Sequence, residues 1–128
     1  MADARALYRE GFQHFADDHI DEAIDCYQRA VDAEPDLAIA WNGLSMTLKR
    51  KGDLDGAIEA GLKIVELDPE DTAAHRDLGR SLLESDSPIE AAEIFARAIG
   101  LAEAAGDIQT GHEIHAFLRQ AEKRLDQH

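Results

Sequence analysis

Apolar side chains recur along most of the chain at spacings of three and four residues, the period of an amphipathic helix. The alternation of β-branched and aromatic residues that is typical of strands is missing. The apolar pattern and the polar or helix-breaking residues between its segments predict seven helices. Their expected ranges are about 4–16, 20–33, 38–51, 54–67, 72–84, 88–105 and 107–126.

The segments between the predicted helices carry residues that end one helix and start the next. Gly52 is suited to the left-handed conformation after a helix, and Asp53 can cap the helix that follows. Pro35 lacks an amide proton, so the preceding helix must end before it. Ser87 followed by Pro88 is a typical helix start, with serine at the N-cap and proline at the first helical position.

The helical pattern repeats itself with a fixed period. Alanine recurs at positions 23, 57 and 91, and again at 6, 40 and 74, while proline recurs at 35 and 69. A period of about 34 residues predicts one helix–turn–helix unit that is stacked several times. The last predicted helix has an apolar face with Gly111, Ile114, Leu118, Ala121 and Leu125 and a polar opposite side, as expected for a cap on a stack of repeats.

The residues at fixed places in each period resemble those of the tetratricopeptide repeat (TPR) family. The matching residues are Leu7, Gly11, Ala23, Tyr27, Ala30 and Pro35, then Trp41, Leu44, Leu48, Gly52, Ala57 and Pro69, then Leu78, Gly79, Leu82, Ala91, Phe95 and Ala98. Gly61, where the family prefers an aromatic residue, and Glu10, where it prefers leucine, depart from the pattern. The resemblance implies an all-α, right-handed solenoid in one domain over residues 1–128. Its parts are repeats at about 4–37, 38–71 and 72–106 and a capping helix at about 107–126.

Composition and charge narrow the function classes. Lysine and arginine number 13 against 27 aspartate and glutamate residues, and the net charge is −14. This balance opposes binding to nucleic acids and anionic membranes, since both rely on contacts between cations and phosphates. No apolar run is long enough to span a bilayer. The single cysteine, Cys26, cannot form an internal disulfide, so we expect a cytoplasmic protein.

The TPR resemblance implies a concave groove, lined by the first helix of each repeat, that holds a peptide. The residues assigned to this groove include Tyr8, Phe12, Phe15, Asn42, Met46, Lys49, Arg50, Arg76 and Arg80, together with Arg5, Leu83 and Glu84. Cations outnumber anions at these positions although the protein is acidic, which predicts an acidic peptide as the ligand. The alternative is that these cations pair locally with surface carboxylates such as Asp77.

One specialised form of TPR groove does not fit this sequence. Co-chaperones of the family grip acidic chaperone tails with a two-carboxylate clamp built from lysine, arginine and asparagine. The matching positions here hold Tyr8, Phe12, Gly43, Ala73 and Asp77. The resemblance therefore implies peptide binding by a different set of contacts.

No residue pattern indicates catalysis, a cofactor or a metal. His112 and His115 lie three residues apart, but zinc needs three or four ligands and no further ligand motif accompanies them. We expect a non-catalytic adaptor for a protein or peptide partner. Two alternatives stay open: a self-assembling scaffold, in which the chain forms a homo-oligomer, and a small TPR chaperone of the secretion type.

Overall fold

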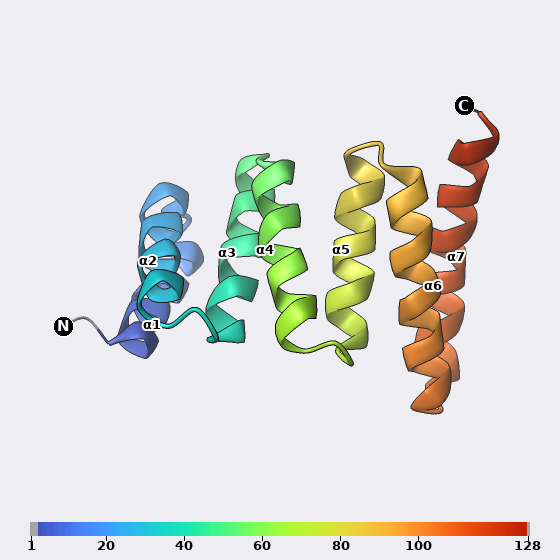
Figure 1. Cartoon of the computed structure of the whole chain (residues 1–128). Helices are drawn as coiled ribbons and strands as arrows, with labels where there is room; N and C mark the ends of the chain where they lie inside the picture. The colour runs from blue at the N-terminus through green and yellow to red at the C-terminus, as the bar shows by residue number, and fades with distance from the viewer. Residues whose placement is uncertain (1–2, 128) are drawn as a thin grey trace. The chain divides into compact units, whose positions relative to one another are not determined.

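The computed structural model describes residues 3–127, and their only regular elements are seven α-helices (Figure 1). The helices are α1 (Ala4–Ala16), α2 (Ile20–Ala33), α3 (Ala38–Lys51), α4 (Leu54–Leu67), α5 (Thr72–Glu84), α6 (Pro88–Ala104) and α7 (Ile108–Asp126). The predicted all-α class is confirmed. Helix α6 ends one residue before its expected end, and α7 begins one residue after its expected start. Residues 1, 2 and 128 of the predicted domain lie outside the described part.

Four helices begin at an aspartate whose carboxylate accepts a hydrogen bond from the backbone N–H of the first turn. The caps are Asp3 with Arg5, Asp53 with Gly56, Asp71 with Ala74 and Asp107 with Thr110, at 2.9–3.1 Å. Such caps satisfy amides that have no partner inside the helix. Ser87 stands at the predicted N-cap of α6, but its hydroxyl lies 3.3 Å from that of Ser85 and forms no cap bond.

The turns between the two helices of each repeat use the same backbone conformation. Gly52 has a φ of 95°, which confirms the left-handed conformation predicted for it. Asp18 and Asp86, one repeat period before and after it, adopt φ values of 63° and 59°. Aspartate tolerates this region better than most residues with a side chain. The repeat period is therefore visible in the backbone as well as in the sequence.

The chain divides into two compact units, the first ending at Asp68 and the second beginning at Pro69. The first unit contains α1–α4 and the second contains α5–α7. Each unit is described separately below. The right-handed superhelix and the single domain predicted from the sequence both concern the whole chain, and both stay predictions.

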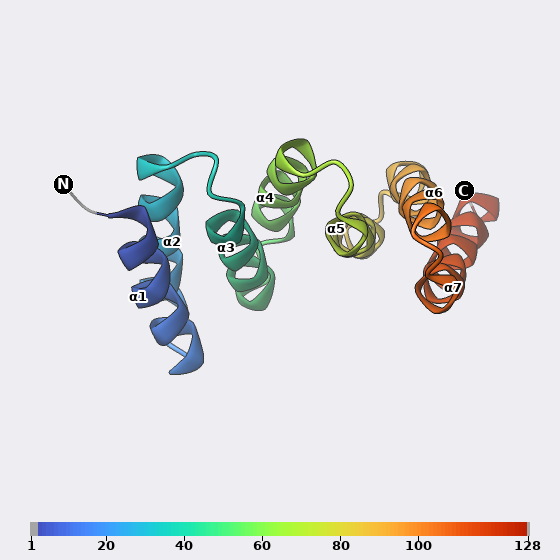
Figure 2. The same cartoon turned by 90° about the horizontal axis from the view of Figure 1, so that it is seen from below.

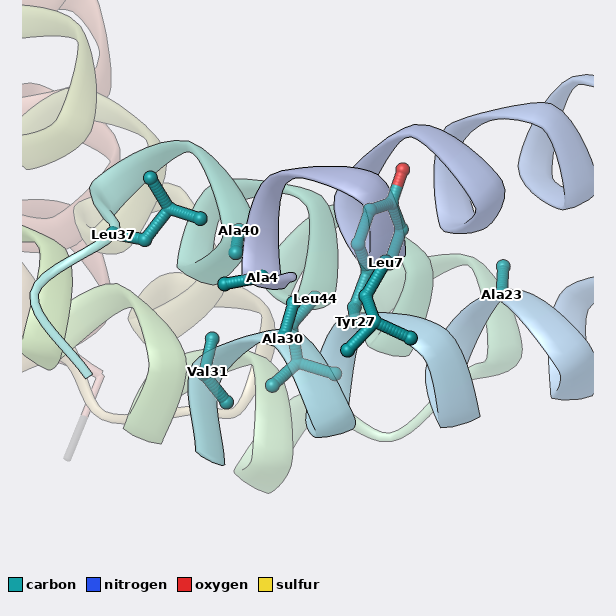
Figure 3. Packing of buried hydrophobic residues seen from close by; sticks show 9 residues of the cluster. All are labelled: Ala4, Leu7, Ala23, Tyr27, Ala30, Val31, Leu37, Ala40 and Leu44. Atoms are coloured by element: carbon teal, nitrogen blue, oxygen red, sulfur yellow. The ribbon is translucent and has the colours of Figure 1, made fainter. Parts of the chain in front are cut away.

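The core of the first unit is built where α1, α2 and α3 meet (Figure 3). Its buried residues are Ala4, Leu7, Ala23, Tyr27, Ala30, Val31, Leu37, Ala40 and Leu44. The Tyr27 ring packs against two glycines: a Cβ atom at Gly11 would lie 2.9 Å from the ring, and one at Gly43 would lie 2.6 Å from it. Glycine is therefore what allows α1 and α3 to approach the same ring.

The second unit repeats this arrangement with a different ring. Phe95 of α6 is fully buried, and a Cβ atom at Gly79 of α5 would lie 2.5 Å from it. Helix α7 lies beside α6 in both views (Figures 1 and 2), and its Phe117 stacks on Phe95 with ring centres 5.7 Å apart.

The buried face of α7 differs in part from the apolar face that the sequence predicted. Ile114 and Ala121 are fully buried as expected, whereas Leu125 is 37% exposed. A strict seven-residue spacing drifts by about 20° per heptad on a straight helix, so the predicted stripe turns away from the core by its last residue. Arg124 instead reaches α5, where its guanidinium donates a 2.5 Å hydrogen bond to the carbonyl of Leu83.

Candidate peptide-binding site

Three predicted site residues of the first unit form an aromatic row along α1. The ring centres of Tyr8 and Phe12 are 6.4 Å apart, and Tyr8 also lies 5.8 Å from Tyr27 of the core. Phe12 is 57% exposed, whereas Tyr8 and Phe15 are half-buried. A hollow of about 250 Å³ lies beside Tyr8, Arg9 and Phe12. The row thus offers apolar surface next to a small concavity.

Four further predicted residues lie on α3, which contacts α1 within the same unit. Met46 is 50% exposed and accepts a 3.6 Å hydrogen bond from the Asn42 amide one turn before it. Lys49 is half-buried and Arg50 is exposed at the end of the helix. The α3 residues therefore place a polar amide, an exposed thioether and two cations on one helix.

Arg50 has two contacts inside the first unit. Its guanidinium lies 5.8 Å from the centre of the Phe15 ring and donates a 2.7 Å hydrogen bond to the Asp18 carboxylate. Both side chains of this ion pair are more than half exposed, so water competes with it, and such pairs contribute only about 0–1 kcal/mol. Arg50 is held in place by these contacts, and its charge is partly balanced.

The predicted site residues of the second unit, Arg76 and Arg80, lie on α5. Arg76 donates a 3.2 Å hydrogen bond to the carboxylate of Asp77, a local pair of the kind that the sequence left open. The exposed Arg80 lies 5.1 Å from the centre of the Phe117 ring of α7. Phe117 is a neighbour that the sequence did not reveal, because α7 is out of phase with the earlier repeats.

One residue assigned to the groove is not available for a ligand. Leu83 is buried, and its carbonyl accepts the hydrogen bond from Arg124 of α7. The assignment of Leu83 to an open groove was therefore wrong.

Gly43, one of the positions that match the two-carboxylate clamp, packs against the buried Tyr27 ring. A side chain at this position would meet the buried Tyr27 ring, since even a Cβ atom would lie 2.6 Å from its Cε1. Burial raises the pKa of the Tyr27 hydroxyl to about 12, with smaller contributions from Tyr8 and Cys26. The position is thus occupied by core packing and leaves no room for a ligand-binding amide.

Comparison with known proteins assigns the fold. The family model described as "Tetratricopeptide repeat" matches residues 8–72, which is just over half of the chain. The chain belongs to the tetratricopeptide repeat family. The match ends at the start of α5, yet the glycine–aromatic pair of Gly79 and Phe95 in the second unit has the same form as that of Gly11 and Tyr27 in the first.

Three known proteins show how far the similarity of this chain extends. The peroxisomal targeting signal receptor of Candida albicans is 34% identical over 83 residues, which are 65% of this chain and 14% of the receptor. A crystal structure of MamA is 29% identical and covers 81% of this chain and 61% of MamA, with a TM-score of 0.77. The first TPR domain of Spaghetti (RPAP3), bound to the Hsp90 peptide SRMEEVD, is 24% identical and covers 96% of this chain and 93% of that domain, with a TM-score of 0.81.

These comparisons assign this chain to a class of protein-interaction modules. Domains of this family are generally non-catalytic modules for protein interaction. The chain spans only 14–17% of the length of the peroxisomal receptors that it matches. Among residues 3–127, no helix is long and apolar enough to cross a membrane. No group of three or more potential metal ligands gathers in the same part of the chain.

Proposed function

We propose that this TPR chain is a non-catalytic adaptor that binds a peptide segment in which apolar and acidic side chains alternate or adjoin. The apolar side chains of the peptide pack on Phe12 and Met46 of the first unit, and its carboxylates pair with nearby cations. In the second unit, Arg76 and Arg80 of α5 are proposed as a carboxylate-binding pair of their own. The cytoplasmic location expected from the single cysteine is part of this proposal.

The observation that carries the proposal is the exposure of Phe12 and Met46 on two helices that contact one another. Phe12 is 57% exposed and Met46 is 50% exposed, although each is large enough to contribute on the order of 2 kcal/mol when fully buried. Phe12 and Met46 stand one repeat period apart, so a shared apolar face is part of the proposal, and exposed apolar side chains that gather on one face are typical of an interaction surface. Tyr8 backs this face through its contact with Phe12.

The charges at the predicted site positions support the proposal that the ligand is acidic. The whole chain has a net charge of −14, yet the predicted groove positions carry five cations and one carboxylate, Glu84. Arginine is well suited to carboxylates because its planar guanidinium can donate two parallel hydrogen bonds. The pairing of Arg50 with Asp18 and of Arg76 with Asp77 keeps these cations ordered, and a stronger carboxylate ligand can displace such exposed partners.

The similar proteins support peptide recognition in general. One is named as a receptor for a targeting signal, and another is bound to SRMEEVD, a peptide that combines methionine and valine with three carboxylate side chains. The structural likeness to the latter lies at 24% identity and concerns the fold. Because Gly43 leaves no room for a clamp asparagine, we propose that the contacts of this chain differ from a two-carboxylate clamp.

The experiment is a selection of random peptides displayed on phage against the intact chain, followed by titration of the enriched peptides in solution. The proposal predicts enriched peptides that combine Asp or Glu with a large apolar residue, and whose affinity falls as salt is raised. Enrichment of peptides without acidic residues, or affinities that do not respond to salt, would refute the acidic ligand. Light scattering at two concentrations tests the scaffold alternative, which requires self-association.

A further inference from the structure

A second concave surface lies between α1 and α2, away from the proposed peptide site. It is a groove of about 620 Å³, and its lining includes Glu10 and His14 of α1 together with Glu22, Asp25 and Cys26 of α2. None of these five residues belongs to the site described above. The groove is larger than the hollow of about 250 Å³ beside Tyr8 and Phe12.

The equivalent positions of the next repeat indicate that a helix fits in this groove. Glu10 and His14 stand one repeat period before Leu44 and Leu48 of α3. Those two leucines pack in the core of the first unit, where α2 covers α3. The same face of α1 carries a carboxylate and an imidazole and borders the groove. A helix lying on α1 as α2 lies on α3 would therefore occupy this space.

The charge of the groove selects the helix. Glu10, Glu22 and Asp25 bring three carboxylates to its lining, which also includes one arginine, Arg29, 4.0 Å from Asp25. Asp21, also in the lining, is hydrogen-bonded to Lys51. Leucine side chains like those at the equivalent α3 positions would suit an apolar helix, whereas this face suits a helix with lysine or arginine.

Cys26 of α2 also lines the groove. Its side chain is only 6% exposed, and its thiol forms no hydrogen bond to any residue between 3 and 127. Burial raises the pKa of this thiol, and the charges of Glu10 and Asp25 raise it further. The raised pKa keeps the thiol neutral, so Glu10 and Asp25 beside it are the groups with which a cationic ligand would pair.

We propose that this groove is a second docking site, which holds a helical segment of a partner protein with lysine or arginine on the face turned towards Glu10 and Asp25. The segment takes the place on α1 that α2 takes on α3. The two docking sites of the first unit then have opposite preferences, one for acidic peptides and one for basic helices.

The test uses a fluorescent amphipathic peptide made of alanine, leucine and lysine, with a glutamate version of the same peptide as its control. We expect the lysine peptide to bind and the double variant Glu10→Gln/Asp25→Asn to bind it about tenfold more weakly, which corresponds to two charge contacts. The matched control is Asp36→Asn/Glu59→Gln, which makes the same change in net charge at positions outside the groove. It should alter the affinity by less than about twofold.

Two further measurements separate this proposal from its competitors. The saturating lysine peptide should slow alkylation of Cys26 by iodoacetamide, and the Phe12→Ser/Met46→Ser variant should still bind it. If Glu10→Gln/Asp25→Asn and Asp36→Asn/Glu59→Gln lost the same affinity for the lysine peptide, the peptide would be attracted by net charge alone, and the proposal would be overturned. An unchanged rate of Cys26 alkylation would also overturn it. The proposal would also be overturned if light scattering showed a dimer for the wild type and a monomer for Glu10→Gln/Asp25→Asn. The occupant of the groove would then be a second copy of this chain.

Discussion

The two units of this TPR chain solve the same packing problem in different ways. In each, the second helix of a repeat carries a large ring that presses on a glycine of the first helix: Tyr27 on Gly11, and Phe95 on Gly79. The units differ on the other side of the ring. The first unit meets Tyr27 with Gly43 of α3, whereas the second stacks Phe117 of α7 on Phe95.

The position between the two rings shows a third solution. Gly61 stands one repeat period after Tyr27 and one before Phe95, and it has no ring to offer the helix opposite. The residue equivalent to Gly11 and Gly79 is Ser45, whose hydroxyl donates a 3.0 Å hydrogen bond to the carbonyl of Ala57 in α4. Each repeat thus keeps a contact between its two paired helices. The sizes of the side chains that make this contact differ from one repeat to the next.

The largest expected effect comes from removing a ring. Phe95→Ala should lower the free energy of unfolding by about 3–5 kcal/mol, because Phe95 is fully buried and its loss leaves a cavity. Tyr27→Ala should have an effect of similar size. Urea unfolding followed by circular dichroism measures both. If the two losses differed severalfold, the two units would not be equivalent in the way we describe.

The next effect comes from adding a methyl group to the glycine side of the contact. Gly43→Ala should lower the free energy of unfolding by about 1–2 kcal/mol, since crowding of the Tyr27 ring exceeds the gain in helix propensity. Gly100→Ala is the control in α6, because Gly100 is exposed and a Cβ atom there would meet nothing within 4 Å. It should raise stability by up to about 1 kcal/mol. A stabilising Gly43→Ala would contradict the close approach of α3 to the ring.

A pH series distinguishes the two rings, since only Tyr27 can ionise. Burial raises the pKa of Tyr27 from 10.0 to about 12, so the folded state retains a proton that the unfolded state loses. The stability from this group is fully present below pH 10 and is lost as the pH rises towards 12. In thermal melts, the melting temperature of Tyr27→Phe should therefore fall less than that of the wild type as the pH rises from 10 towards 12. Identical pH profiles would mean that Tyr27 ionises freely.

The smallest effect on stability is expected at the arginines, where the effect on binding should be large. Arg76→Glu/Arg80→Glu should change the free energy of unfolding by less than about 1 kcal/mol, because exposed ion pairs and exposed cation–π contacts contribute little. The same variant should lose binding of the selected acidic peptide. If binding survives with the same salt dependence, the two arginines are ordinary surface residues.

The helices and their period could be predicted from the sequence because both are local properties. Helix ends are set by residues such as Gly52, Asp53 and Pro88, and the period is carried by small residues that recur at the same place in each repeat. The bounds of all seven helices agree with the predicted ones to within one residue at each end.

Other features could not be found because they depend on contacts outside the period. Gly43 has Arg9 and Asp77 as its repeat equivalents, so only the position of the Tyr27 ring reveals its role. Phe117 escaped because α6 is 17 residues long, which shifts α7 out of phase with the earlier repeats. The pairing of Arg50 with Asp18, 32 residues away, likewise required the fold.

The central claim is that a peptide packs on the exposed apolar side chains of α1 and α3. The most direct test is the affinity of a peptide selected on the intact chain for two variants, Phe12→Ser in the proposed site and Leu62→Ser on α4, where the leucine is 49% exposed. We predict at least about tenfold weaker binding for Phe12→Ser, from the loss of roughly 1.4 kcal/mol or more of apolar contact, and unchanged binding for Leu62→Ser. Equal affinity for Phe12→Ser and the wild type, with both proteins folded, would contradict the account.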